Sequence, residues 1–267
     1  MISLSSPSDK LRVEISEGVA RLIIDNGARR NAIDLAMWRA IPPLMAELAS
    51  RDDVRALIVA GARGLPFCSG ADISEFATVR STSAGAHAYE VANTAAFDAI
   101  SNLPFPTIAA ISGFCMGGGM GVACACDLRI AEAGAVFAIP AARLGVGYPP
   151  SAMRYVVAAV GVQRAYELFF TARRLDAQQA LAAGLLAHVY APEAFAGAID
   201  ELAAIIARNA PLTLKAAKAS IRATAGLPGA PSHDACEALA LACFESDDFA
   251  EGRTAFLEKR TPVFRGR

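Results

Sequence analysis

Three consecutive glycines, Gly117 to Gly119, lie in the apolar stretch GFCMGGGMGVACACD at residues 113–127. Each glycine costs roughly 1 kcal/mol relative to alanine inside a helix, so the run indicates a need for bare backbone. A strand that enters a helix through GFCMGGG places several N–H groups at the positive end of the helix dipole. The pattern predicts an anion or oxyanion site, with close packing of small residues as the alternative.

A second glycine-containing turn, GLPFCSGADI at residues 64–73, follows the apolar run VRALIVAGA at residues 54–62. Its Ala71 could present a backbone N–H toward the same point as the glycine run. The chain contains neither GxGxxG in a first βα turn nor GxxxxGK[ST], which argues against a dinucleotide or P-loop site. The second turn therefore favours the oxyanion interpretation.

Composition limits the classes of protein to consider. The 267 residues are 54% hydrophobic, enough for one large domain or a domain with a smaller appendage. The 25 basic and 26 acidic residues form no basic cluster, which argues against a nucleic-acid partner. Three scattered histidines show no metal-ligand spacing, and six cysteines show no CxxC pair. We expect no metal, reduced thiols and a cytoplasmic protein without a signal peptide.

One long uncharged segment, residues 99–126, resembles a membrane span in length. Pro104, Pro106 and five glycines interrupt any continuous helix there. We therefore expect buried core and no membrane partner.

The apolar patterns predict a mixed α/β chain. Alternation at 11–16 and 19–25 predicts a hairpin, and Asp34 is expected to cap a helix over 35–48 that is bent or broken at Pro42 and Pro43. The run at 54–62 predicts a strand buried on both faces. We further expect helices over 84–101, 176–184 and 247–260, strands at 106–112, 127–131, 135–139 and 185–190, mostly helical structure from 149 onward, and a linker at 226–234.

Several motifs occur in an order that resembles the enoyl-CoA hydratase/isomerase family, the crotonase superfamily. They are RRNAID (29–34), FCSGADI (67–73), GFCMGGGMGVACACDLRIA (113–131), FAIPAARLGV (137–146), TARRLDAQQALAAGLL (171–186) and FESDDFAEGRTAFLEKRTPVF (244–264). The resemblance covers nearly the whole chain. It implies an α/β fold with a crotonase-like spiral core of ββα units over 1–205, and a C-terminal helical oligomerisation region over 206–267. A homotrimer or a dimer of trimers is then expected, which agrees with an apolar helical tail.

The same resemblance implies that the N–H groups of Ala71 and Gly118 form an oxyanion hole for a coenzyme A thioester carbonyl. Each such donor contributes ~3 kcal/mol to an enolate-like transition state. Coenzyme A would enter as part of the acyl-CoA substrate, with no tightly bound cofactor. By the same resemblance, residues Arg30, Ala32, Ser69, Asp72 and Ile73 would line the nucleotide and pantetheine, and Phe256 and Lys259 would reach the coenzyme A of a neighbouring subunit. For Lys259 a solvated helix face is the ordinary alternative.

The chain departs from the family at the two glutamates that hold water and shuttle a proton in its hydratases. Those positions are Gly121 and Ala141 here, and neither side chain can exchange a proton. Tyr148 is the most suggestive candidate donor, but a core aromatic with its hydroxyl bonded to backbone is the more ordinary interpretation. Asp127 is expected to anchor backbone, and Cys115 to be unreactive for want of a neighbouring base.

Three functions follow from these observations. The first is an acyl-CoA enzyme of this superfamily that is a poor hydratase, because it lacks the carboxylate pair. The second is a decarboxylase of a malonyl-CoA-like thioester, since loss of carbon dioxide creates an enolate without a base. The third is a coenzyme A-binding protein without turnover.

Overall fold

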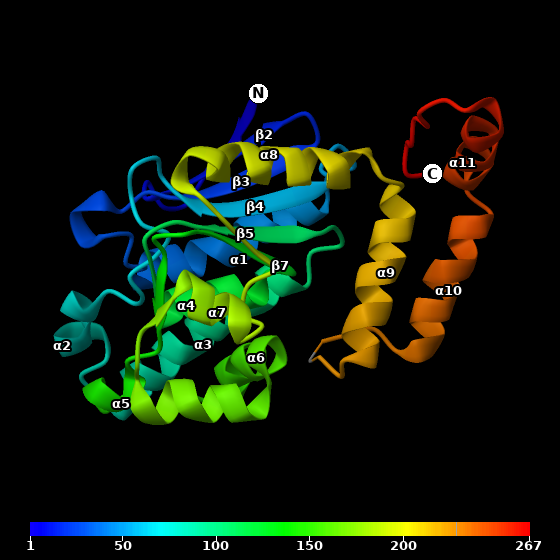
Figure 1. Cartoon of the computed structure of the whole chain (residues 1–267). Coiled ribbons are helices and arrows are strands. Elements are labelled where there is room, and N and C mark those ends of the chain that lie inside the picture. The colour runs from blue at the N-terminus through cyan, green and yellow to red at the C-terminus, as the bar shows by residue number, and fades with distance from the viewer. Residues whose placement is uncertain (228) are drawn as a thin grey trace.

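A seven-stranded sheet forms the centre of the computed structural model, which describes residues 1–227 and 229–267 (Figure 1). The strand order is β1-β2-β3-β4-β5-β7-β10. The pairs β1–β2 and β2–β3 are antiparallel, whereas β3 to β10 run parallel. The strands are β1 (Ile2–Leu4), β2 (Leu11–Ser16), β3 (Val19–Ile24), β4 (Ala56–Gly61), β5 (Thr107–Ile111), β7 (Leu128–Glu132) and β10 (His188–Tyr190).

Alternating side chains on the central strands bury both faces of the sheet. In β4, Leu57 and Val59 join the main core, whereas Ala56 and Ile58 join a smaller core on the opposite face. β5 shows the same alternation, with Ala109 and Ile111 in the main core and Ile108 and Ala110 in the smaller core. A parallel strand covered on both sides is expected to be apolar throughout, so the predicted two-sided burial at 54–62 is confirmed.

Helices cover the two faces unequally. The main core lies beneath α1 (Leu35–Ala49), α3 (Ser83–Ser101) and α4 (Gly118–Ala125), and α8 (Pro192–Arg208) covers the smaller core. The predicted cap of α1 is confirmed, because Asp34 Oδ1 accepts from the Met37 N–H at 2.8 Å. The sequence predicted that this helix would be bent or broken at Pro42 and Pro43, and the prediction of a break is wrong. α1 continues through both prolines, and its buried apolar face offsets the lost backbone bonds.

A second sheet of three short strands lies in the order β6-β8-β9. β6 (Phe114–Met116) pairs with β8 (Val136–Ala138) in parallel, and β9 (Leu175–Asp176) pairs with β8 antiparallel. Strands β1, β6 and β9 were not predicted from the sequence, since their two or three residues show no period of their own. The remaining elements of the body are the 3-10 turns at Gly27–Arg29 and Ile73–Glu75, the short helices α2 (Phe76–Val79), α5 (Ala141–Leu144) and α7 (Ala177–Ala182), and the long helix α6 (Pro150–Thr171).

The last helices form an arm beside the body (Figure 1). They are α9 (Pro211–Thr224), α10 (His233–Phe244) and α11 (Asp247–Glu258). Polar contacts hold α9 to the body. Lys218 pairs with Asp127 at 2.8 Å, and Arg222 donates to Asn102 Oδ1 at 2.7 Å. The α/β body with a helical C-terminal region is as predicted, and a division near residue 205 stays a prediction; α8 itself ends at Arg208.

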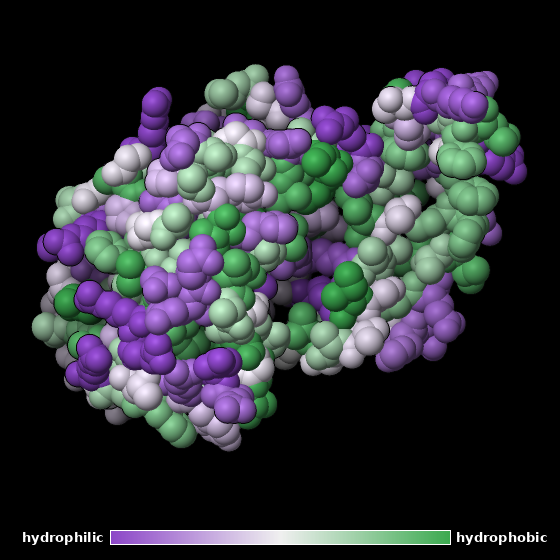
Figure 2. Space-filling model, viewed as in Figure 1, coloured by the Kyte–Doolittle hydropathy of each residue, from purple (hydrophilic) through white to green (hydrophobic). Residues whose placement is uncertain are grey.

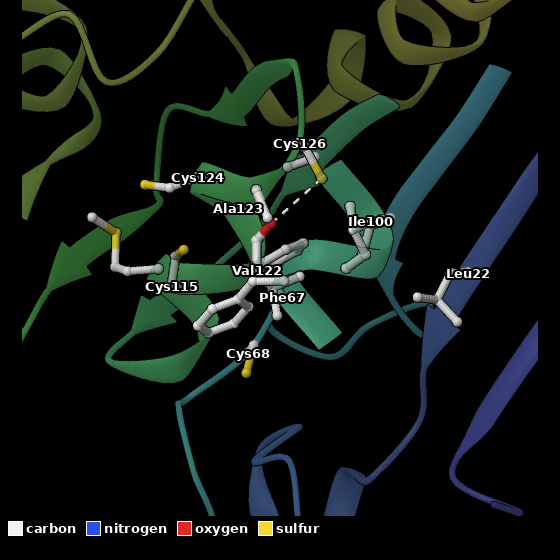
Figure 3. Packing of buried hydrophobic residues seen from close by; sticks show 14 of the residues in the cluster. Leu22, Phe67, Cys68, Ile100, Cys115, Val122, Ala123, Cys124 and Cys126 are labelled. Atoms are coloured by element: carbon white, nitrogen blue, oxygen red, sulfur yellow. Dashed lines mark hydrogen bonds between the residues drawn. The ribbon is translucent and has the colours of Figure 1, made fainter. Parts of the chain in front are cut away.

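The uncharged segment at 99–126 resolves into the end of α3, two strands and α4. Within the described chain, no helix combines the length and the apolarity that a bilayer crossing needs. Its three cysteines pack in the main core among apolar side chains, together with Cys68 (Figure 3). Burial raises the pKa of the Cys115 thiol well above its usual value, which agrees with an unreactive core thiol.

Candidate functional site

Two loops that carry motifs run side by side in front of the main core. The Ser69 N–H donates to the Arg30 carbonyl at 3.2 Å, and the Ile33 N–H donates to the Gly70 carbonyl at 2.8 Å. The Asp72 N–H returns a bond to the Ile33 carbonyl at 3.0 Å. RRNAID and FCSGADI therefore form one continuous wall, although more than thirty residues separate them.

Two glycines give this wall its backbone shape. Gly70 has φ 111° and Gly117 has φ 47°, which is backbone that glycine adopts without a Cβ clash. A Cβ on Gly70 would lie 3.1 Å from the Met116 carbonyl oxygen. The Gly117 N–H donates to the Ala138 carbonyl at 2.9 Å, so β8 holds the start of α4 against the loop.

The N–H groups of Ala71 and Gly118 come close together at the entry of α4. A Cβ built on Gly118 would lie 3.4 Å from the Ala71 nitrogen. Neither N–H donates a hydrogen bond within the described part of the chain, and both residues line a pocket of about 90 Å³. At Gly119 the alternative interpretation also holds, because a Cβ there would lie 2.7 Å from the Cys68 carbonyl oxygen. The glycine run thus serves both an open site and close packing.

The other residues expected to bind coenzyme A divide into three groups. Ser69 and Ile73 line the pocket beside Ala71, and Ile73 is 65% exposed although it is apolar. Arg30 is exposed, and Ala32 is buried in the adjacent wall. Asp72 is buried, and its Oδ1 accepts from the N–H of the following turn at Ser74.

Phe256 and Lys259 belong to the C-terminal arm and lie outside this pocket. Phe256 is 83% exposed, and Lys259 ends α11 in the left-handed conformation with φ 57°.

Tyr148 lines the same pocket as the two amides. Its ring meets Phe169 edge to face at 5.0 Å between centroids. The hydroxyl makes no hydrogen bond within the described chain, so the expected alternative of a backbone-bonded core tyrosine is wrong. Burial raises the pKa of Tyr148, which keeps the phenol protonated and able to donate.

The position of the first missing glutamate is occupied by aromatic packing. A Cβ on Gly121 would lie only 2.2 Å from Phe97 Cζ. The Phe97 ring is held edge to face between Trp38 at 5.6 Å and Tyr155 at 6.0 Å. A glutamate at position 121 would therefore clash with Phe97.

Three pocket residues were not predicted as site residues from the sequence. Glu90 and Asn93 come from α3, and Arg80 follows α2; all three line the pocket with Ala71 and Gly118. Arg80 and Glu90 form a salt bridge with 11% and 21% of their side chains exposed. The one available signal was the i, i+3 spacing of Glu90 and Asn93, which places them on one face of a helix.

Burial dominates the electrostatics of this pair. It raises the pKa of Glu90, and the Arg80 charge and hydrogen bond only partly oppose the rise. A carboxyl with a raised pKa in a pocket is a common property of functional sites. The pocket therefore combines two free backbone donors, a free phenol and a titratable carboxyl.

Known proteins are similar to this chain in both sequence and fold. The family model described as enoyl-CoA hydratase/isomerase matches residues 14–267. Mitochondrial methylglutaconyl-CoA hydratase of Mus musculus is 32% identical, over 97% of this chain and 84% of that protein. The short-chain-enoyl-CoA hydratase of Clostridium acetobutylicum is 31% identical, over 91% and 92%.

A crystal structure of an enoyl-CoA hydratase/carnithine racemase from Magnetospirillum magneticum superposes with a TM-score of 0.92 at 30% identity. The alignment covers 98% of this chain and 97% of that chain. The fold and its pocket thus define a crotonase-type α/β enzyme. The chain belongs to the enoyl-CoA hydratase/isomerase family, as its motifs predicted.

Replacing Gly121 with alanine should lower the free energy of unfolding by about 1 to 3 kcal/mol, because the added methyl overlaps the fixed Phe97 ring. Gly197→Ala is the matched control. Gly197 lies in α8 with nothing within 4 Å of its Cβ position, so that change should stabilise by up to about 1 kcal/mol. Urea unfolding measures both, and equal effects would contradict the packing argument.

Gly118→Val should weaken acyl-CoA binding far more than binding of free coenzyme A, which has no thioester carbonyl. The side chain would fill the space beside the Ala71 N–H. It also costs some stability, because its Cβ would lie 3.0 Å from the Trp38 ring, so binding is measured by calorimetry well below the melting temperature of the variant. An unchanged preference for the thioester would show that these amides do not bind its carbonyl.

Proposed function

We propose that the protein converts an acyl-CoA thioester through an enolate whose oxygen is bound by the Ala71 and Gly118 N–H groups. The observation that carries the proposal is the presence of two unused backbone donors in one small pocket. Negative charge that develops on a thioester oxygen is stabilised by such donors, with ~3 kcal/mol for each. The names of the relatives, methylglutaconyl-CoA hydratase and short-chain-enoyl-CoA hydratase, support a thioester substrate.

The coenzyme A moiety would leave the pocket past Ser69 and Ile73 and follow the wall toward Arg30, Ala32 and Asp72. The exposed apolar Ile73 side chain suits the pantetheine arm, and the Arg30 cation suits the phosphates. Coenzyme A is thus part of the substrate, and the proposed chemistry uses no tightly bound cofactor.

Tyr148 is the proposed proton donor to the enolate. Its hydroxyl is unused, and its raised pKa keeps it protonated at neutral pH, so it holds a proton to donate and cannot accept one. The pocket does not contain the pair of carboxylates that would hold and activate water, since Gly121 and Ala141 replace them. Those features favour reactions that form and protonate an enolate over the hydration of a double bond.

Decarboxylation of a malonyl-CoA-like thioester is the second candidate. The unused Tyr148 hydroxyl beside the two amides favours it, because the departing carbon dioxide leaves its electron pair to the enolate and only a donor is then needed. Enolate formation by removal of a proton needs a base as well as a donor. The need for a base therefore separates that reaction from decarboxylation.

The arm α9–α11 is the proposed assembly surface of a homotrimer or a dimer of trimers. Its apolar side chains are extensively exposed, and they appear as green patches on the arm in Figure 2. They include Ile221, Leu241, Phe244, Phe249, Phe256 and Leu257. In such an assembly Phe256 and Lys259 would reach the coenzyme A site of a neighbouring copy.

Hydration of crotonyl-CoA by the purified protein should be ~10² to 10⁴ slower than by a two-glutamate hydratase, because acid-base catalysis by the pair is missing. Crotonyl-CoA and methylmalonyl-CoA are incubated separately, and mass spectrometry follows gain of water or loss of carbon dioxide. Tyr148→Phe should slow whichever conversion is observed. Tyr155→Phe removes a hydroxyl bound to Asp98 outside the pocket and serves as the control. Efficient hydration that is indifferent to Tyr148→Phe would refute this account.

Light scattering after size-exclusion chromatography should give the mass of a trimer or hexamer at micromolar concentration. Phe244→Glu, which places a charge on the exposed face of α10, should shift the protein toward smaller species. Ile2→Glu adds the same charge at another exposed apolar position, on β1, and should leave the mass unchanged. A monomeric parent protein would contradict the proposed assembly.

A further inference from the structure

Glu90 and Asn93 form one polar face of the pocket. They lie one helical turn apart on α3, and both line the pocket that contains Ala71 and Gly118. Asn93 is 7% exposed, and its Oδ1 has no hydrogen-bond partner in the structure. A buried carbonyl oxygen without a partner costs free energy, so an unpaired acceptor in a pocket indicates a donor that arrives with the ligand.

The Glu90 carboxylate is fixed in this pocket by Arg80. The Arg80 guanidinium lies over the rings of Phe76 and Tyr89, at 4.7 Å from each centroid. The Tyr89 hydroxyl accepts from Trp38 Nε1 at 2.9 Å, and Trp38 in turn contacts the Gly118 position. The carboxylate is thus tied through packed side chains to the same residues that position the amides.

Arg80 and Glu90 also border a second, wider cavity on the outer side of the pocket. Phe76, Arg80, Glu90 and Tyr148 line both the inner pocket and this cavity, which has a volume of about 560 Å³ and also includes His87. Glu90 therefore lies between bulk solvent and the two amides, where a proton that it takes up can be released.

We propose that Glu90 is the base that removes the α-proton of the bound acyl-CoA thioester, with Arg80 as its positioning residue. The inference rests on the proposed function, and it narrows the substrate class to thioesters that carry an α-hydrogen. The position is unlike the two family glutamates, which correspond to Gly121 on α4 and Ala141 on α5. The acid-base group would thus come from α3 instead.

The step balances without any further reactant. Glu90 takes the α-proton, the electrons of the broken C–H bond form a carbon–carbon double bond, and the carbonyl π-electrons move to the oxygen held by Ala71 and Gly118. Protonation of the enolate carbon by Tyr148, or by the Glu90 carboxyl itself, completes the turnover. Asn93 Oδ1 would accept a hydrogen bond from a hydroxyl or water beside the reacting carbon.

The charges around Glu90 agree with this role. Arg80 faces it from the segment after α2, Tyr89 and His87 come from its own helix, and Tyr148 faces it from the segment after α5. Burial raises the pKa of Glu90 and the Arg80 charge lowers it, which leaves a base stronger than an ordinary carboxylate. Tyr148 is a protonated phenol and cannot perform this first step at neutral pH.

Exchange of the α-hydrogens of butyryl-CoA for deuterium in D₂O tests the proposal. Butyryl-CoA is saturated and has no second carboxylate, so it can be neither hydrated nor decarboxylated, and exchange reports enolate formation alone. The parent protein should exchange these hydrogens. Glu90→Gln should slow the exchange by ~10² to 10⁴ while calorimetry shows unchanged butyryl-CoA binding. Glu90→Asp, which retains a carboxylate, should restore part of the rate.

Asp98→Asn provides the matched control for Glu90→Gln. Asp98 lies on the same helix and pairs with Arg154 and Tyr155, but it lies outside the pocket. The rate of butyryl-CoA exchange by the Asp98→Asn variant should equal that of the parent protein. Thermal melts of all variants separate loss of the fold from loss of the base.

The pH profile of exchange tests the positioning role of Arg80. Exchange should rise with pH as Glu90 loses its proton. Arg80→Met removes the positive charge that lowers the pKa of Glu90, so the midpoint should move upward. Arg80→Lys keeps the charge and should remain close to the parent. A merely structural Arg80 would change the rate or the melting temperature without moving the midpoint.

Two failures are distinguishable. Exchange by Glu90→Gln at the parent rate would overturn the role of Glu90 and leave the proposed function intact, provided that Gly118→Val abolishes exchange. A parent protein that binds butyryl-CoA without exchange would equally exclude Glu90 as an α-proton base, whereas one that binds no acyl-CoA would overturn the proposed function as well.

Discussion

Two backbone N–H groups that point into a pocket without an acceptor are the constraint on which the rest of the structure depends. Backbone donors are almost always paired in folded proteins, so keeping Ala71 and Gly118 open requires the surrounding chain to be fixed by other bonds. The parallel pairing of 30–33 with 69–72 fixes one amide, and the bond from Gly117 to Ala138 fixes the other. Trp38 packs against the Gly118 position.

Sequence patterns predicted most of this framework because its signals are local. The two-residue alternation in β2 and β3, the Asp34 cap and the apolar run of β4 each appear within a few residues. The position of the amides could also be predicted from the sequence, since backbone conformations such as those of Gly70 and Gly117 need glycine. The prolines in α1 misled the prediction because local backbone cost was outweighed by burial of a long apolar helix face, which no short window contains.

The polar half of the pocket was not predictable in the same way. Glu90, Asn93 and Arg80 belong to no motif, and their sequence neighbours are ordinary helix residues. They become a site only because α3 packs between α1 and α4 and turns one face toward the amides. The absence of a glutamate at Gly121 was visible in the sequence, but its physical counterpart, the Phe97 ring in that space, required the packed core.

The absence of a carboxylate at Gly121 and the presence of one at Glu90 are physically coupled. With Phe97 held between Trp38 and Tyr155, the α4 wall is apolar and could not solvate a carboxylate. The carboxylate in this pocket is instead on α3, where Arg80 supplies an opposite charge and the rings of Phe76 and Tyr89 hold that charge in place. A buried carboxylate without such a partner would be protonated and lose its use as a base. The apolar α4 wall and the ion pair between Arg80 and Glu90 are therefore two consequences of one packing arrangement around the two backbone amides.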